Sequence, residues 1–125
     1  MIVGIGTDLA EVDRIRAAIE RHGRRFTDRI YTPSEIDYVE RKANRYERYA
    51  ARFAAKEATM KAMGTGWNRN VGWREIEVVR ERGRAPGIVL HGKTAEFARR
   101  RNIANFHVSL SHTASTAIAH VIVEG

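Results

Sequence analysis

The stretch Arg52–Gly66, RFAAKEATMKAMGTG, constrains the fold of this chain more than any other part of it. Plotted as a helix at about 100° per residue, together with the residues before it, this segment is apolar on two opposite sides. Alanines line one side and aromatic residues with Met60 line the other, so the clearly polar positions form one strip: Arg52, Lys56 and Thr59. A helix with this pattern is normally buried in the middle of a domain, and we expect the chain to fold around it.

Glu57 is the exception in this helix, because it falls inside the larger apolar arc. A carboxylate in such a place is costly unless a cation, a proton or a metal ion satisfies it. Lys61 lies one turn further on, about 6 Å along the axis. An ion pair between Glu57 and Lys61 would be a structural explanation. A metal or phosphate site with an ammonium group beside it is the functional one, and the helix alone leaves both open.

Composition narrows the class of protein. The 125 residues suffice for one domain over 1–125 with a proper core, and the absence of cysteine excludes disulfides and thiolate metal sites. A net charge of +7 favours acidic partners such as nucleic acid, anionic lipid, a phosphorylated ligand or an acidic protein. The sequence has neither a membrane-length apolar run nor the pattern of a secretory signal, so we expect a cytoplasmic protein without a membrane partner.

The N-terminal segment, residues 1–10, alternates like a strand. One face carries Gly4, Gly6 and Asp8, and two glycines in a strand indicate close approach of another backbone or of a ligand. Asp8 follows the two glycines on this face. Its carboxylate suits either a ligand site or the N-cap of the helix that follows.

Helices are expected over residues 11–22, from Thr32 to about Ala43, and over 46–63. The first is ended by Gly23 and presents a basic face, with Arg14 and Arg21 two turns apart and Arg24 just beyond the glycine. This face is either simply solvated or a docking surface. The second helix begins with Thr32-Pro33-Ser34-Glu35, a strong capping-box signature.

Beyond a loop over 67–73 the hydrophobic pattern changes to a period of two. We expect strands at about 75–82 and 88–90, a helix from Gly92 to about Arg101, and a hairpin of strands 105–112 and 116–123. His112 ends a strand beside the hairpin turn, where it is either a structural residue or a phosphate or substrate contact. The whole pattern predicts an α+β fold, mainly antiparallel sheet with helices packed on one face.

Three stretches of the chain together resemble one family. They are GIGTDLAEVDRI, RFAAKEATMKAMGTG and VSLSHTASTAIA. In this order and spacing they resemble the holo-[acyl-carrier-protein] synthases, the small single-domain type of 4′-phosphopantetheinyl transferase. The resemblance extends through nearly the whole chain, and the central stretch is its most specific part.

The resemblance implies a reaction and a set of site residues. Such enzymes move 4′-phosphopantetheine from coenzyme A to a serine of apo-acyl carrier protein in fatty acid biosynthesis, leave adenosine 3′,5′-bisphosphate, and need Mg²⁺. It makes Asp8 and Glu57 the metal ligands and Glu57 and Lys61 the catalytic residues. The expected contacts to coenzyme A are Arg52, Lys56 and His112, and the expected carrier-docking residues are Arg14, Arg21 and Arg24. It also implies a homotrimer with active sites between subunits.

The residue chemistry agrees with these roles. Mg²⁺ often takes only one or two carboxylates and completes its shell with substrate phosphates and water. Glu57, directly or through a water, is the candidate base for the serine proton, and Lys61 is placed to stabilise or protonate the departing phosphate.

Two alternatives stay open at this point. One is a transferase that serves polyketide or peptide synthase carriers. The other, from a different class, is a basic nucleic-acid-binding module; it would explain the arginines but not Glu57, and the chain lacks interleaved exposed aromatic residues or a known binding motif. We therefore expect no nucleic-acid partner.

Overall fold

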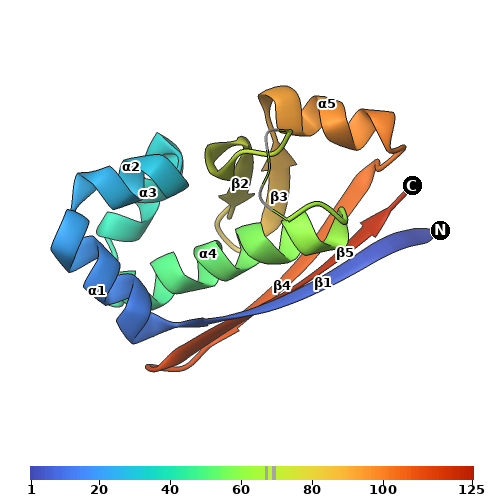
Figure 1. The fold of residues 1–125 in the computed structure, drawn as a ribbon. Coiled ribbons are helices and arrows are strands. Elements are labelled where there is room, and N and C mark those ends of the chain that lie inside the picture. Colours follow the sequence, from blue (N-terminus) through green and yellow to red (C-terminus); the bar gives the residue numbers. More distant parts are fainter. Residues whose placement is uncertain (67, 69) are drawn as a thin grey trace.

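The long helix α4 (Arg45–Ala62) is the centre of the fold (Figure 1). The structure is a computed structural model that describes residues 1–66, 68 and 70–125. Helix α4 lies along one face of a three-stranded antiparallel sheet formed by β1 (Ile2–Glu11), β5 (Thr116–Glu124) and β4 (Asn105–His112), with β5 in the middle. Its alanines are buried against this sheet, because small side chains let the helix and the strands approach closely.

Strand β1 meets α4 through its glycine face. A Cβ atom at Gly4 would collide with the carbonyl oxygen of Ala62, and one at Gly6 with that of Ala58. The expectation that these glycines allow another backbone to approach is therefore confirmed, and the backbone is that of α4. This contact fixes the height of β1 along α4, and with it the position of Asp8.

Three short helices cover the N-terminal end of α4: α1 (Val12–His22), α2 (Arg24–Ile30) and α3 (Pro33–Glu40) (Figure 1). On the side of α4 away from the large sheet lie the 3-10 turn η1 (Trp73–Glu75) and the antiparallel pair β2 (Ile76–Val79) and β3 (Gly87–Leu90). Helix α5 (Gly92–Arg100) follows β3.

The predicted α+β class is confirmed, and so is the capping box. The Thr32 side chain accepts from the Glu35 backbone N–H while the Glu35 carboxylate accepts from the Thr32 N–H. Helix α2 was not predicted. Gly23 has a φ of 57° there, so the chain turns and begins a second helix at once instead of entering a loop. The expected helix from Thr32 also ends earlier, at Glu40.

The antiparallel strands divide into the two separate sheets described above. Residues 67 and 69 of the predicted loop lie outside the described part of the chain. Among the described residues, no helix combines the length and the hydrophobicity that crossing a bilayer requires.

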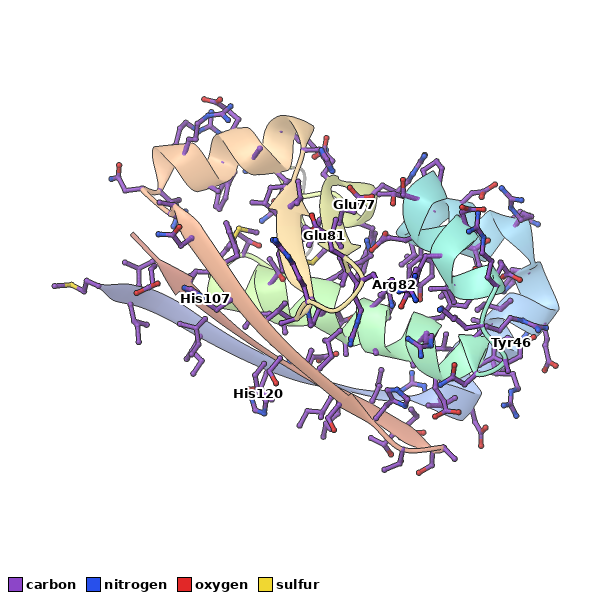
Figure 2. All side chains as sticks on the ribbon, turned by 180° about the vertical axis from the view of Figure 1, so that it is seen from behind. Tyr46, Glu77, Glu81, Arg82, His107 and His120 are labelled. Atoms are coloured by element: carbon purple, nitrogen blue, oxygen red, sulfur yellow. The ribbon has the colours of Figure 1, made fainter. Side chains whose placement is uncertain are left out.

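The outer face of the large sheet, away from α4, carries exposed apolar side chains. Val3, Ile5 and Leu9 of β1 are all more than half exposed. His120 of β5 points outward from the same face, and its ring nitrogen lies 2.9 Å from the Thr7 hydroxyl (Figure 2). Exposed apolar side chains gathered on one face of a sheet are typical of an interface.

Candidate active site

The structure brings Asp8, Glu57 and Lys61 together where β1 crosses α4. The Lys61 ammonium lies 2.9 Å from Oδ1 of Asp8 and donates a 3.0 Å hydrogen bond to the Thr7 carbonyl oxygen. Asp8 is not a helix N-cap, because β1 continues to Glu11 and Glu11 occupies the cap position. Within the described part of the chain, the ion-pair partner of Lys61 is Asp8, so the alternative of a Glu57–Lys61 pair is wrong.

The electrostatics of this cluster favour an additional cation. Burial, and next the neighbouring Asp8 carboxylate, raise the pKa of Glu57 above its ordinary value, while Lys61 acts in the opposite direction. The hydrogen bond to Asp8 raises the pKa of Lys61. The half-exposed Lys61 ammonium pairs directly with Asp8 and acts on Glu57 only through space, so the repulsion between the two carboxylates is only partly relieved.

The carboxylates of Asp8 and Glu57 fit Mg²⁺ in the type and the number of ligands. The described residues contain no group of three or more His, Cys, Asp or Glu side chains able to hold a metal ion, so a cage made only of protein ligands is not present there. Two carboxylates with open positions beside them suit a cation that completes its shell with phosphate oxygens and water. Zn²⁺ would require more nitrogen or sulfur ligands.

A pocket of about 570 Å³ opens next to the carboxylates. Its polar lining includes Asp8, Glu11 and Glu57, and its apolar wall includes Ile15, Phe26 and Phe53. Arg14 of α1 lines the same pocket, which places the expected docking helix directly beside the candidate catalytic residues.

The metal-free protein should lose stability as the pH rises through the titration of Glu57. Below the ordinary glutamate pKa of about 4.3, Glu57 is protonated in both folded and unfolded states and favours neither. Between that pH and the raised pKa of the folded state, the unfolded chain ionises first, so stability falls as pH rises. The measurement is thermal unfolding in EDTA against pH for wild type and Glu57→Gln. The midpoint difference, variant minus wild type, should grow with pH and shrink when Mg²⁺ is added. Parallel pH profiles would contradict it.

A second polar cluster lies on another side of α4. A pocket of about 120 Å³ is lined by Arg52 together with Arg48, Arg80, Pro86 and His112. Arg52 is only 4% exposed, and its Nε atom is buried without a hydrogen-bond partner in the described part of the chain. Burial lowers the pKa of this guanidinium. The guanidinium carbon lies 4.7 Å from the centre of the Tyr38 ring, but a buried N–H without an acceptor is costly, so the pocket is suited to an anion that would accept a hydrogen bond there.

Sequence reasoning found Arg52 and His112 but missed Arg48 and Arg80. Arg48 could have been found, since it lies one helical turn before Arg52 on the same side of α4. Arg80 follows β2 and reaches this pocket only through the tertiary packing of β2 against α4, for which the sequence carries no local signal.

Lys56 lies in neither pocket. Its side chain is 0% exposed and its ammonium lies 2.7 Å from Oε1 of Glu35. It also donates to the backbone carbonyl oxygens of Trp73 and Ile76, so three partners occupy its three N–H donors. The polar strip of the helix, Arg52, Lys56 and Thr59, is therefore buried rather than solvated. This environment leaves Lys56 no free donor for coenzyme A.

Comparisons with known proteins agree on one family. The model of the 4′-phosphopantetheinyl transferase superfamily matches residues 4–118. The chain belongs to this superfamily. It is 58% identical to the holo-[acyl-carrier-protein] synthase of Solibacter usitatus over 124 residues, which cover 99% of both chains. The crystal structure of the Neisseria meningitidis holo-[acyl-carrier-protein] synthase superposes with a TM-score of 0.93 at 32% identity and covers 100% of both chains.

A further relative has been solved with a ligand. The Helicobacter pylori holo-[acyl-carrier-protein] synthase in complex with coenzyme A has a TM-score of 0.85 and 32% identity, covering 96% of this chain and 99% of that one. Membership of the phosphopantetheinyl transferases identifies the chain as a transferase and disfavours the alternative of a nucleic-acid-binding module.

The three arginines expected to dock the carrier lie in different surroundings in this member of the family. Arg14 and Arg21 are exposed on α1, and Arg14 borders the carboxylate pocket. Arg24 belongs to α2 instead of a loop, and its guanidinium lies 2.9 Å from Asp28 one turn away. Its charge is therefore partly neutralised within α2, which favours Arg14 and Arg21 over Arg24 for attracting an acidic partner.

Proposed function

We propose that Asp8 and Glu57 hold a magnesium ion for the reaction of this family. That reaction is the transfer of phosphopantetheine from coenzyme A to acyl carrier protein, and the chain is a transferase of fatty acid biosynthesis. The observation that carries the metal assignment is that the carboxylates of Asp8 on β1 and Glu57 on α4 line the same pocket, while the Lys61 ammonium pairs with Asp8. A bound Mg²⁺ supplies charge neutralisation for the phosphate oxygens of coenzyme A.

The protein groups then divide the remaining work. Lys61 holds its ammonium next to the carboxylates, where it can stabilise negative charge that develops on the leaving phosphate. Glu57 accepts the proton of the attacking serine hydroxyl of the carrier, directly or through a water. Ile15, Phe26 and Phe53 place apolar wall beside the carboxylates, which lowers the local dielectric and so strengthens electrostatic interactions on that side of the pocket. The leaving product is adenosine 3′,5′-bisphosphate.

The arginine pocket is the proposed site for the other phosphate of coenzyme A. Coenzyme A carries a pyrophosphate, which the carboxylate site would receive, and a separate 3′-phosphate. The buried unpartnered Nε of Arg52, with Arg48, Arg80 and His112 around it, suits that 3′-phosphate. The relative from Helicobacter pylori, which was solved in complex with coenzyme A, supports a coenzyme A site in this fold. In this proposal Lys56, whose three N–H donors are already occupied, supports the pocket structurally and does not contact coenzyme A.

A homotrimer with active sites between subunits is part of the proposal. Arg52 and Glu57 are five residues apart on α4, and so about 140° apart around its axis. The two pockets of one chain therefore face different directions. If the arginine pocket of one chain faces the carboxylate pocket of its neighbour, one coenzyme A can reach both and is bound by two chains. The exposed apolar face of β1 supplies a surface for such contacts.

Intact-mass analysis of an apo-carrier protein tests the function directly. The carrier is incubated with this protein, coenzyme A and Mg²⁺, and a mass gain of one phosphopantetheine is expected, absent with EDTA. Apo-carriers of fatty acid, polyketide and peptide synthases run in parallel separate the proposed substrate from the remaining alternative. No gain on any carrier would contradict the activity, and a full gain in EDTA would contradict the metal.

Charge reversal on α1 should weaken carrier binding. Acyl carrier proteins are expected to be acidic, so Arg14→Glu or Arg21→Glu should raise the apparent KM for the carrier roughly tenfold. Arg21→Glu should leave the KM for coenzyme A unchanged, because Arg21 is not among the residues that line the carboxylate pocket. Added salt should bring wild type toward the variants, because exposed charges are screened over about 8–10 Å. Titration of carrier at saturating coenzyme A measures this.

Arg100→Glu is the matched control, since this exposed arginine lies in the last turn of α5. If the α1 variants keep the wild-type KM at low salt and Arg100→Glu does not, the cluster Arg99–Arg101 is the docking surface instead.

A further inference from the structure

Glu47, in the first turn of α4, contacts the end of β4. Its Oε1 atom lies 2.9 Å from Nδ1 of His112, and the two side chains are 25% and 31% exposed. His112 lines the arginine pocket with Arg48, Arg52 and Arg80. With Nδ1 committed to Glu47, the ring nitrogen left for a ligand in this pocket is Nε2.

A carboxylate so close to a pocket built for an anion needs an explanation. Glu47 would repel a phosphate bound there, and near the N-terminus of α4 it can also act simply as a favourable partner of the helix dipole. A carboxylate bonded to one nitrogen of a histidine, however, fixes the orientation of the ring and determines which nitrogen faces the ligand. A ring that donates from Nδ1 to Glu47 can also donate from Nε2 only in its protonated form, which has two donors.

We propose that Glu47 is a positioning residue that orients His112 toward the 3′-phosphate of coenzyme A. The inference rests on the proposed function of the arginine pocket and adds a residue to it. Glu47 does not touch the ligand. It acts through the imidazole, whose Nε2–H becomes a fixed donor to the phosphate next to the guanidinium of Arg52.

For coenzyme A binding by Glu47→Ala, a positioning role and a purely electrostatic role of Glu47 predict opposite changes in affinity. If Glu47 acts on the pocket only as a negative charge, Glu47→Ala makes the pocket more positive and tightens the binding of coenzyme A. If Glu47 positions His112, the same change weakens binding, because the imidazole is free to rotate away from the phosphate.

Calorimetric titration with coenzyme A and with 3′-dephospho-coenzyme A separates these roles. We expect Glu47→Ala to weaken coenzyme A binding roughly tenfold and to leave the binding of the dephospho compound unchanged. Glu47→Gln, whose amide oxygen can still accept from Nδ1, should stay close to wild type. The double variant Glu47→Ala/His112→Ala should bind coenzyme A no more weakly than His112→Ala alone, because both changes remove one interaction.

Other results overturn the inference. Tighter binding of coenzyme A to Glu47→Ala would show that charge alone acts, and equal losses for both ligands would show a general structural defect of α4. If wild type itself binds both ligands equally, the pocket does not receive the 3′-phosphate, and the proposed role of Glu47 is wrong. The transferase activity would still be supported in that case by a mass gain in the carrier experiment.

Discussion

Glu57→Gln is expected to lower kcat for phosphopantetheine transfer by roughly 10³-fold while the protein stays folded. Glutamine keeps the size of the side chain and removes the charge that a divalent cation requires. It also removes the proton acceptor proposed for the carrier serine. Because burial and Asp8 raise the pKa of Glu57, loss of its charge relieves repulsion in the metal-free protein, and the variant should not be less stable than wild type. Steady-state kinetics at saturating Mg²⁺ and thermal unfolding together test this.

Asp8→Asn should show the same kinetic phenotype, since both carboxylates serve one ion. The double variant should be little worse than either single one, because groups that act as a unit are far from additive. A calorimetric Mg²⁺ titration provides an independent measurement and should show binding lost in each variant. Near-normal turnover of Glu57→Gln would overturn the metal assignment and return Glu57 to a structural role.

The sequence predicted those parts of the site whose signals are local. Two glycines and an aspartate alternate along one strand, and Glu57 interrupts an apolar arc; both patterns are visible without a partner element. The structure adds the reason why they meet: β1 approaches α4 so closely that neither Gly4 nor Gly6 has room for a Cβ atom. The pairing of Lys61 with Asp8 instead of Glu57 could not be predicted, because it depends on that crossing.

Features that depend on long-range packing were missed or misassigned. Helix α2 is only seven residues long, too short to show a helical period, and it begins through the positive φ of Gly23. Arg80, the residue after β2, joins the arginine pocket, and Lys56 is covered by residues of α3 and β2, which are distant in sequence. A helical wheel shows on which side of the helix Lys56 lies, but it cannot show that a buried carboxylate from a different helix, Glu35 of α3, pairs with it.

Removing one member of the buried pair formed by Lys56 and Glu35 should strongly destabilise the fold. Both side chains are 0% exposed, and the Glu35 carboxylate also accepts from the backbone N–H groups of Thr32 and Val78. The pair thereby joins α3, α4 and β2. Desolvation already lowers the pKa of Lys56, and Glu35 opposes this shift. Removal of the ammonium would leave Glu35 as a buried charge without its partner.

Lys56→Met is therefore expected to reduce the free energy of unfolding by about 3–5 kcal/mol, a large part of the total for a domain of this size. Urea denaturation measures it, with Arg41→Ala as control, because the Arg41–Asp37 pair is exposed and its loss should change stability little. Lys56→Met/Glu35→Leu should recover only part of the loss, since the carbonyl groups of Trp73 and Ile76 and the N–H of Val78 remain unsatisfied. The folded fraction of Lys56→Met should still bind coenzyme A with nearly wild-type affinity. A stable variant with a tenfold loss of that affinity would show instead that Lys56 reaches the ligand, and that its buried position in this structure changes when coenzyme A binds.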